Sequence, residues 1–538
     1  MAGDGYSLTT LDDFRGGLNY RLDAFDVELN ESPDLLNVSV DPRGGISLRD
    51  GVVTAARTAL ASNVKGIWSY YNDDGTSEVL VNYGTSVAVL NGVDFDPLPF
   101  AGNITNRTDG SRVYGTTINN VAYGVSGDQV SFYYNGTAGT DLGTTLDGTP
   151  GNFPIAQYVT HWNNFAWVGN TKEGATYEKN RVRFSHANLP TQWSDLDYID
   201  VGKGEGGDYI TGVVGHNDRL MIFKSNSTYA VFGFDGDSFQ MVTVSERVGS
   251  TPLSSPVSTP HGVFFWHARE GVYLYDGSNM HWLFEKLKPA IDDGRVAFGV
   301  APQLTWGNNK LYVSFQYNNP DTNALEQRVF VYDPTLNSWV LWDVEVEALW
   351  THTPTDDTDS VYGACVTNTG TVVKIDSASY PADRYSYTGG NYVSTNIAAY
   401  LQSAWIKTRN PIVRKRWGQI RLILSAEQTV DLGVEVFHDY NTSEAVREYT
   451  TRVVSREGNS SIWAAVAGTA TPTWQSDDGL TGDGEWSASG GSSAVDIKKL
   501  GTGGTASAIC VKVVGPTVQN AVWEVNGIAF PYKSRRMR

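Results

Sequence analysis

An all-β fold is the class that this sequence predicts, and three observations predict it. The 538 residues include 56 glycines and 12 % aromatic residues but only 5 methionines, a composition typical of β proteins. Short runs of alternating apolar and polar residues recur between turn-forming residues along most of the chain. The chain is also too long for one ordinary core, so we expect several domains or one large repeat domain.

The middle of the chain, residues 56–385, repeats one local pattern. A polar turn, often Asn-Asn, Asp-Asp-Gly or His-Gly, is followed by a strand-like run, a second turn and another run. Residues 306–319 (WGNNKLYVSFQYNN) and 328–343 (RVFVYDPTLNSWVLWD) are examples. Successive units begin roughly 40 to 50 residues apart, which is the spacing of blades in a β-propeller. We therefore predict a propeller of six or seven irregular blades; an array of β-sandwiches is the alternative.

The pattern changes after the repeats. Alternating runs return at 419–426, 430–440, 507–515 and 521–532, and a Gly-, Ser- and Thr-rich stretch separates the second run from the third. These runs predict a C-terminal β-sandwich-like domain over residues 386–538, with a short basic tail.

Residues 1–55 are predicted to form an extended N-terminal arm. Between residues 13 and 51 the apolar side chains arrive singly or in pairs, and two Gly-Gly pairs and two prolines interrupt them. Such a segment cannot make a core of its own, and ordering its backbone costs entropy that contacts with another surface must offset. We expect the arm to lie along the propeller or along a neighbouring subunit.

The arm also carries three ordered motifs. They are F-x-G-G-L-N from Phe14, N-E-x-P-D-x-x-N-V from Asn30, and G-G-I-x-x-R-x-G from Gly44. In this order they resemble the N-terminus of tail proteins of double-stranded DNA bacteriophages, a family variously called stabilisation, tail nozzle, hub or minor tail proteins.

The resemblance implies a structural, non-enzymatic component of a virion tail that assembles in the cytoplasm of the bacterial host. It implies a homo-oligomeric ring, with six-fold symmetry favoured, that extends or closes the DNA conduit. Phage DNA would pass through the lumen without sequence-specific binding. Other tail proteins, on the adaptor or portal side and among the fibres or spikes, would be its partners. The arm residues that we expect to dock are Phe14, Gly16, Gly17, Asn30, Pro33, Asn37, Gly44, Gly45 and Arg49.

Residues 407–421 are the clearest local anomaly of charge. They hold six Lys and Arg residues and no acidic residue, in a chain of net charge −19. Three interpretations remain open: a solvated strand face, a contact with an acidic neighbouring subunit, or a contact with DNA in a channel. The candidate interface residues are Arg414, Lys415, Arg416 and Arg421.

Signs of catalytic or cofactor chemistry are weak in this sequence. Its net charge of −19 argues against general nucleic-acid binding. The acidic clusters lack the pattern of a calcium loop, and the chain has neither a G-x-S-x-G nor an H-E-x-x-H motif. Cys365 and Cys510 are expected to be buried free thiols. We expect no catalytic residue, no metal, no cofactor and no membrane span.

Two other functions compete with the tail-ring hypothesis. One is a tail-tip receptor-binding propeller that binds or degrades glycans. It predicts a site at the central mouth of the propeller with an exposed aromatic side chain and a pair of carboxylates. The other is a propeller scaffold outside any virus, which would not need the N-terminal arm.

Overall fold

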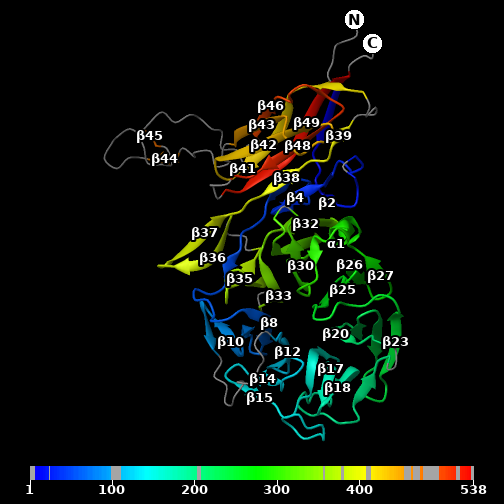
Figure 1. The fold of residues 1–538 in the computed structure, drawn as a ribbon. Helices are drawn as coiled ribbons and strands as arrows, with labels where there is room; N and C mark the ends of the chain where they lie inside the picture. The colour runs from blue at the N-terminus through cyan, green and yellow to red at the C-terminus, as the bar shows by residue number, and fades with distance from the viewer. Residues whose placement is uncertain are drawn as a thin grey trace. The chain divides into compact units, whose positions relative to one another are not determined.

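The computed structural model describes residues 7–23, 25–97, 111–202, 207–320, 322–354, 358–376, 381–407, 413–453, 462–464, 473–475, 496–516 and 521–534. Figure 1 shows that these residues form many small sheets. Within this part of the chain, the helical segments are a 3-10 turn at Glu285–Leu287 and the short helix α1 at Lys288–Asp292. The predicted all-β class is therefore confirmed.

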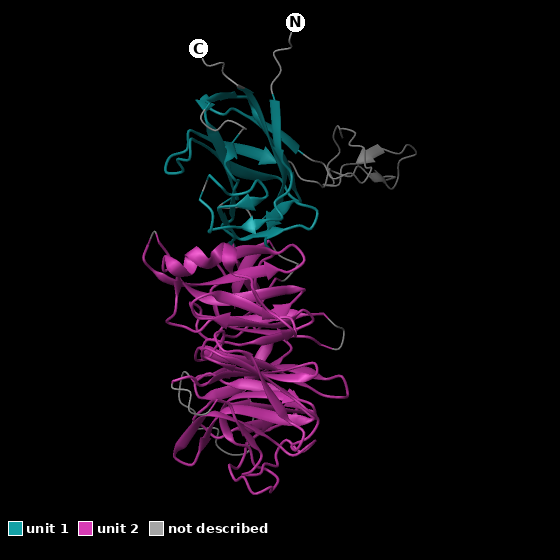
Figure 2. Ribbon diagram, turned by 90° about the vertical axis from the view of Figure 1, so that its right-hand side faces the viewer, with its two compact units in different colours: residues 1–49, 396–538 teal, residues 50–395 magenta. Residues whose placement is uncertain are grey.

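The chain divides into two compact units. Unit 1 combines residues 1–49 with residues 396–538, and unit 2 consists of residues 50–395 (Figure 2). This division differs from the expected arm, propeller and C-terminal domain at 1–55, 56–385 and 386–538. The first 49 residues share a unit with the C-terminal domain, and the propeller is inserted between the two parts of that unit.

Unit 2 is a β-propeller of seven blades. The first three blades are β8–β11 (Val64–Tyr71, Ser77–Tyr83, Ser86–Asn91, Asp94–Pro97), β12–β15 (Tyr114–Ile118, Val121–Val125, Phe132–Tyr134, Gly139–Asp141) and β16–β19 (Ile155–Trp162, Phe165–Glu173, Thr176–Phe184, Tyr198–Asp200). Blades 4 and 5 are β20–β23 (Ile210–His216, Arg219–Lys224, Thr228–Phe232, Gln240–Ser245) and β24–β27 (Val257–Thr259, Gly262–His267, Gly271–Tyr275, Met280–Trp282).

Blade 6 contains β28–β32 (Val296–Ala297, Gln303–Gly307, Lys310–Asn318, Leu325–Asp333, Ser338–Trp342). Blade 7 contains β33–β35 (Val346–His352, Ser360–Cys365, Val372–Ile375), to which β7 (Val53–Thr54), β36 (Ala382–Thr388) and β37 (Asn391–Asn396) are added. The inner strands β8, β12, β16, β20, β24, β29 and β33 each contact the next, and β33 contacts β8. The ring is therefore closed, and the predicted propeller is confirmed with the larger of the two predicted blade counts.

Blade 7 is completed by the residues that enter the propeller. β7 pairs antiparallel with β35, with Val53 opposite Lys374 and Thr54 opposite Val373. β36, at the end of the propeller, pairs with β7 in parallel. The two ends of the unit are thus hydrogen-bonded to each other, and this pairing closes the ring.

The Asn-Asn dipeptides that marked the repeats have one structural role. Asn119-Asn120, Asn163-Asn164 and Asn308-Asn309 all have positive φ angles, between 49° and 67°, and each pair joins the first strand of a blade to the second. Two successive residues with positive φ form a type I′ turn, whose twist suits an antiparallel hairpin, and Asn tolerates this conformation better than most residues. This turn explains why the dipeptide recurs.

Aromatic side chains fill the spaces between blades. Trp68 is fully buried, in a cluster that joins blades 1 and 2, and Trp167 is fully buried between blades 3 and 4. At Gly115 an added Cβ would lie 2.5 Å from the Trp68 ring, so blade 2 needs glycine there for the two blades to approach. These two tryptophans therefore serve in packing between blades.

Unit 1 contains two large sheets and two smaller ones. The eight-stranded sheet holds β1, β5, β6, β40, β41, β46, β47 and β49 (Ser7–Leu11, Val38–Val40, Ile46–Leu48, Lys415–Trp417, Ile420–Ala426, Asp496–Leu500, Thr505–Ala506, Trp523–Ser534). The six-stranded sheet holds β4, β38, β39, β42, β43 and β48 (Asp34–Leu36, Tyr400–Gln402, Ile406–Lys407, Val430–His438, Arg447–Val453, Ala508–Val514). Two pairs, β2 with β3 (Gly17–Leu18, Glu31–Ser32) and β44 with β45 (Ile462–Ala464, Thr473–Gln475), stand apart.

The N-terminal arm supplies strands to both large sheets of unit 1. β1 pairs with β49 along its whole length, from Ser7 opposite Tyr532 to Leu11 opposite Ile528, and β4 pairs with β38. In these pairings the arm lies along the C-terminal part of its own chain, whereas its last strand, β7, pairs with β35 of the propeller. β1 and β4 find their hydrogen-bond partners in the C-terminal part of the same chain, which offsets the entropy that ordering the arm costs.

A matched pair of leucines in β1 tests whether the arm is part of the fold of unit 1. Leu11 is buried, with 2 % of its surface exposed, whereas Leu8 in the same strand is 57 % exposed. Leu11→Ala should lower the free energy of unfolding by about 2–5 kcal/mol because it leaves a cavity. Leu8→Ala should change it by at most about 0.5 kcal/mol. Urea unfolding of both variants measures the difference, and equal small losses would show that the arm is not integral.

Candidate functional site

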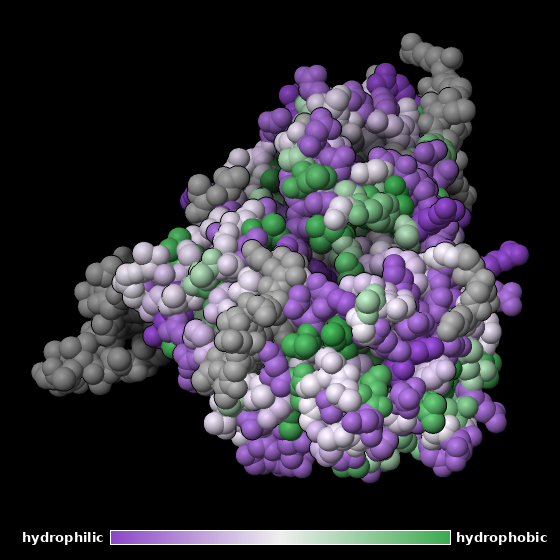
Figure 3. Space-filling model, turned by 60° about the horizontal axis from the view of Figure 1, so that its bottom comes forward, coloured by the Kyte–Doolittle hydropathy of each residue, from purple (hydrophilic) through white to green (hydrophobic). Residues whose placement is uncertain are grey.

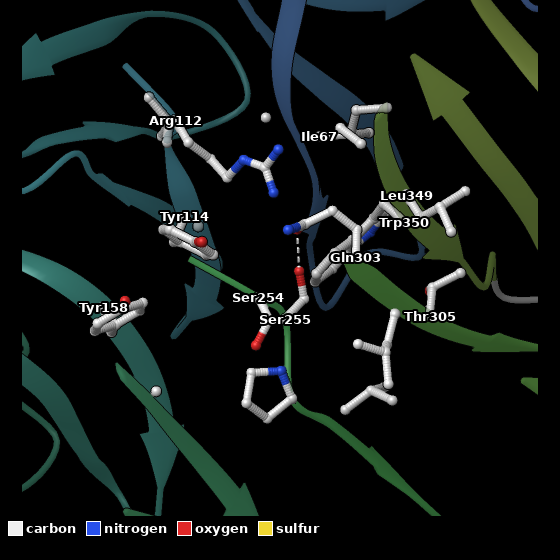
Figure 4. A pocket seen from close by; sticks show the side chains of 18 of the residues that line it. Ile67, Arg112, Tyr114, Tyr158, Ser254, Ser255, Gln303, Thr305, Leu349 and Trp350 are labelled. Atoms are coloured by element: carbon white, nitrogen blue, oxygen red, sulfur yellow. Dashed lines mark hydrogen bonds between the residues drawn. The ribbon is translucent and has the colours of Figure 1, made fainter. Parts of the chain in front are cut away.

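The inner strands of the propeller surround a cavity of about 200 Å³ (Figure 4). Each blade contributes to its wall, so residues far apart in the sequence meet there. The contributing side chains include Ile67, Tyr114, Tyr158, Val213, Ser255, Gln303 and Trp350. The wall combines apolar and polar groups, as ligand pockets commonly do.

A second hollow, of about 580 Å³, lies where the inner strands begin. Lys65 and Arg112 line both hollows, and Gln157, Leu253 and Glu347 line this one. We call it the mouth. Connections between blades and turns between second and third strands form its rim, and loops on a rigid scaffold are common places for binding residues.

Leu253 stands between the two hollows. It lines the mouth, whereas the next residues, Ser254 and Ser255, line the inner cavity. Its φ angle is +62°, a conformation that a leucine rarely adopts. Backbone strain of this kind persists only where surrounding contacts hold it, and it is common at functional sites.

Side chains from three other blades hold the backbone of Leu253. Its carbonyl oxygen accepts hydrogen bonds from the Tyr114 hydroxyl at 2.7 Å and from Gln303 Nε2 at 2.7 Å, and its N–H donates to the Tyr158 hydroxyl at 3.1 Å. Arg112 adds a longer contact to the same carbonyl, at 3.4 Å. The backbone at Leu253 therefore bridges blades 2, 3 and 6 where the mouth meets the inner cavity.

The two tyrosines of this clamp remain protonated at neutral pH. Burial raises the pKa of Tyr114 to about 12, and burial also raises the pKa of Tyr158 far above its usual value. Tyr114 can therefore act only as a hydroxyl donor to the Leu253 carbonyl, and the clamp does not depend on pH in the physiological range.

The mouth carries charges of both signs. Lys65 Nζ lies 2.5 Å from Glu347 Oε1, and Arg112 Nη2 lies 4.0 Å from the same oxygen. Asp128 adds a second carboxylate to the lining, and Tyr177, 49 % exposed, adds an aromatic ring. With two cations and two carboxylates, the lining does not favour a strongly charged ligand of either sign.

Hydrogen bonds between inner strands join neighbouring blades. Trp350 Nε1 donates to Ser69 Oγ at 2.8 Å, and that oxygen lies 2.9 Å from His352 Nδ1. His216 Nδ1 lies 2.8 Å from Ser258 Oγ between blades 4 and 5. Although a serine beside a histidine has the composition of a nucleophile and its base, Ser69 is only 2 % exposed. We interpret these pairs as contacts that hold blades together.

The predicted arm residues are used within unit 1. Phe14, Gly16, Gly17, Asn37, Gly44, Gly45 and Arg49 are buried, and Asn30 and Pro33 are half-buried. Arg49 Nε donates to Asn37 Oδ1 at 2.8 Å, and Asn37 Nδ2 donates to the Ala398 carbonyl at 2.6 Å. At Gly45 an added Cβ would lie 2.7 Å from Glu524 Oε1. We expected these residues to dock on another surface. That expectation is wrong for the buried ones, because other parts of their own chain cover them.

The predicted basic residues differ in exposure, because neighbouring side chains in a strand point to opposite faces. Arg414, Arg416 and Arg421 are exposed, whereas Lys415 is buried with 1 % exposure, and its Nζ donates to the Ser507 carbonyl at 3.3 Å. Lys415 is therefore not available to a partner. Arg414 also has a partner in its own unit, Asp439, at 3.2 Å. Arg416 and Arg421 remain the best-placed residues of the block for an interface.

Nothing in the sequence indicated which residues line the inner cavity and the mouth. Lys65 and Glu347 are separated by 282 positions and meet only because the seventh blade closes against the first. The sequence did not single out Leu253, because positive φ angles are normally found at glycine or asparagine. Within the described residues, no group of three or more His, Cys, Asp or Glu side chains could hold a metal ion. No helix in this part of the chain is long and apolar enough to cross a membrane.

Comparison with known proteins gives structural neighbours only. No family model matches the chain, and no curated protein matches it. Among solved structures, the extracellular domain of a putative hybrid two-component system from B. thetaiotaomicron is 12 % identical, with a TM-score of 0.38, over 61 % of this chain and 40 % of that chain. This chain thus spans about two fifths of that protein.

Two further neighbours are structures of YCF48. YCF48 bound to D1 peptide is 8 % identical, with a TM-score of 0.37, over 64 % of this chain and 99 % of that chain. YCF48 from Cyanidioschyzon merolae is 11 % identical, with a TM-score of 0.39, over 60 % and 98 %. At these identities and scores the similarities do not extend to activity or partners.

The buried histidines predict how stability depends on pH. Burial lowers the pKa of His216 and of His352 below the usual value. The unfolded chain then binds protons more readily than the folded chain once the pH falls below about 6.5. The stability from these histidines is thus fully present above that pH and is lost as the pH falls.

Thermal unfolding between about pH 7.5 and 5 measures this loss. We expect the melting temperature to fall with pH in the wild-type protein, and His352→Gln to fall less steeply. The exposed His261→Gln is the control for a change of composition. Identical slopes in all three proteins would contradict the assignment.

Proposed function

We propose that this protein is a ring-forming structural subunit of a tailed-phage virion, a tail nozzle or hub protein that extends or closes the DNA conduit and docks fibres or spikes during genome delivery. The observation that carries the proposal is the ordered motif between Phe14 and Gly51.

The contacts of the motif residues within unit 1 suggest that chains with this motif resemble one another in the fold of this unit. At Gly16 an added Cβ would lie 2.6 Å from Glu31 Cγ, and Gly45 is equally tight against Glu524. Arg49 and Asn37 are joined in the interior. These residues are therefore requirements of a particular β fold, and a chain that shares the motif in order is expected to share that fold.

The work that we propose for the protein is mechanical. Two chain connections, at residues 49–50 and 395–396, join the propeller to unit 1, so a force on unit 1 acts on both ends of the propeller. Those two ends are paired through β7 and β36. A double connection resists local unfolding better than a single linker and suits rearrangement by rigid bodies.

In this proposal the DNA passes through the lumen of a ring of subunits and not through the propeller of any one subunit. The inner cavity has a volume of only about 200 Å³, and the clamped backbone of Leu253 lies where it meets the mouth. Duplex DNA is far larger, since its major groove alone is about 12 Å wide.

Quantitative mass spectrometry of purified particles tests the proposal. The copy number of this protein, counted against the portal, should be about half the portal count if it forms a six-fold ring. Another tail protein counted in the same run is the control for losses during purification. Absence of the protein from the particles would overturn the assignment to the virion.

The mouth favours a second candidate, a propeller that binds glycans at the tail tip. Tyr177 is an exposed aromatic ring at the mouth, and Asp128 and Glu347 supply carboxylates from blades 2 and 7. Sugars are commonly held by an aromatic face together with polar groups that fix their orientation.

A glycan array with the full-length protein tests this candidate. If the mouth binds sugars, Tyr177→Ala and Asp128→Asn should each weaken the signal at least tenfold. The control is Tyr392→Ala, which removes an equally exposed tyrosine (40 % exposed) that does not line the mouth. Binding that survives both substitutions, or no binding at all, would reject the mouth as a glycan site.

A further inference from the structure

The outward face of the eight-stranded sheet in unit 1 collects positive charge. Arg416 of β40 lies opposite Lys533 of β49, and Arg421 of β41 lies opposite Lys499 of β46. Opposite residues share a face of the sheet, and side chains along a strand alternate between faces. Arg421 is also opposite Ala529, which is four positions from Lys533 in β49, so all four cations point the same way. We call this surface the basic face.

The register of this sheet places like charges opposite each other. Like charges directly opposite each other destabilise a sheet, and here two such pairs occur on one face. Arg416, Arg421 and Lys499 are exposed, and none of their side chains has a hydrogen bond or ion pair with another described residue. A partner of opposite charge would relieve the repulsion between these cations.

Apolar side chains lie on the same face. Leu8, opposite Pro531, is 57 % exposed, and Ile497, opposite Ile423, is 55 % exposed. Leu8 in β1 and Ile497 in β46 lie on either side of the strands β41 and β49. Exposed apolar groups mixed with arginines are a composition found in protein interfaces. A polyanion such as DNA would need the cations but not the leucine and isoleucine.

The complementary surface is present on the propeller of the same chain. Residues 50–395 hold 20 Lys and Arg against 37 Asp and Glu, whereas unit 1 holds 20 against 22, so the propeller carries nearly all of the net negative charge. A second copy of this chain therefore offers the basic face an acidic partner.

Blade 4 offers apolar and acidic groups together. Its outermost strand β23 has one unpaired edge and exposes Met241 and Val242, and the turn before it exposes 84 % of Phe234. Asp235, Asp237 and Glu246 flank these residues and are exposed. Figure 1 shows β23 at the outer rim of the propeller. On the face seen in Figure 3, apolar residues gather in small patches among polar ones. An exposed edge strand with apolar side chains is a site where natural proteins usually place a cover.

We propose that the basic face of one chain docks on the outer strand of blade 4 of a second copy. The two surfaces differ, so the contact is heterologous, and repeating it produces a closed ring when the rotation between copies closes. The inference rests on the proposed ring and names the surfaces that build it.

Charge reversal on each surface tests the contact in the full-length protein. Arg416→Glu with Arg421→Glu, and separately Asp235→Lys with Asp237→Lys, should each reduce the assembled fraction in sedimentation velocity at least tenfold. Mixing the two double variants should restore assembly, since each supplies the surface that the other has lost. The control, Lys179→Glu with Arg269→Glu, reverses two exposed cations elsewhere on the propeller and should assemble normally.

A cysteine pair gives an independent readout. Arg421→Cys in one chain and Asp237→Cys in another should form a disulfide between chains under mild oxidation, because the native Cys365 and Cys510 are buried and do not compete. Lys179→Cys in place of Arg421→Cys should give no such product.

Three outcomes would overturn the proposal. One is normal assembly of both charge-reversed proteins, and a second is failure of the mixture to recover. The third is loss of duplex DNA binding in the Arg416→Glu and Arg421→Glu protein with assembly unchanged, which would assign the face to DNA. A six-fold copy number in particles together with any of these results would reject these surfaces while keeping the proposed tail ring. If the charge reversals change assembly as expected but the protein is absent from particles, the proposed surfaces would stand and the proposed tail ring would be rejected.

Discussion

The pairing of β7 with β35 is the constraint on which the rest of the propeller depends. Each blade buries its faces only against its neighbours, so a ring with one open seam leaves two blades half-exposed. Only Val53 and Thr54 pair in β7, but neighbouring contacts reinforce them: the N–H of Val52 donates to Asp383 Oδ1 at 3.1 Å, and the N–H of Arg384 donates to the Val52 carbonyl at 2.8 Å. Closure of the ring also places Lys65 beside Glu347 and brings four side chains into contact with the backbone of Leu253.

The fold was largely predictable because its signals are local. Alternating runs and Asn-Asn turns depend on residues next to one another, and both appear in the structure at the predicted places. The number of blades and the partner of the arm were not predictable in this way. β1 pairs with a strand more than 500 positions away, and nothing in a seven-residue window indicates which distant edge it will meet.

The candidate sites show the same limit in different ways. Lys415 could have been separated from Arg414 and Arg416 by sequence alone, because neighbours in a strand point to opposite faces. The mouth could not have been found, since its lining comes from eight separate segments of the chain, one of which is a leucine in an unusual conformation. The opposed cations of the basic face appear only when the register between β41 and β46 is known.

The insertion of the propeller into unit 1 sets an order of events during synthesis. β49 is made more than 500 residues after β1, so the sheet that holds β1 cannot be completed until those residues have left the ribosome. At about 5–20 residues per second, β1 waits roughly half a minute or longer for its partner. The propeller can close earlier, once β35 and β36 emerge to meet β7. The exposed β1 edge is then the vulnerable element of the nascent chain, and a chaperone that shields extended apolar segments would act there.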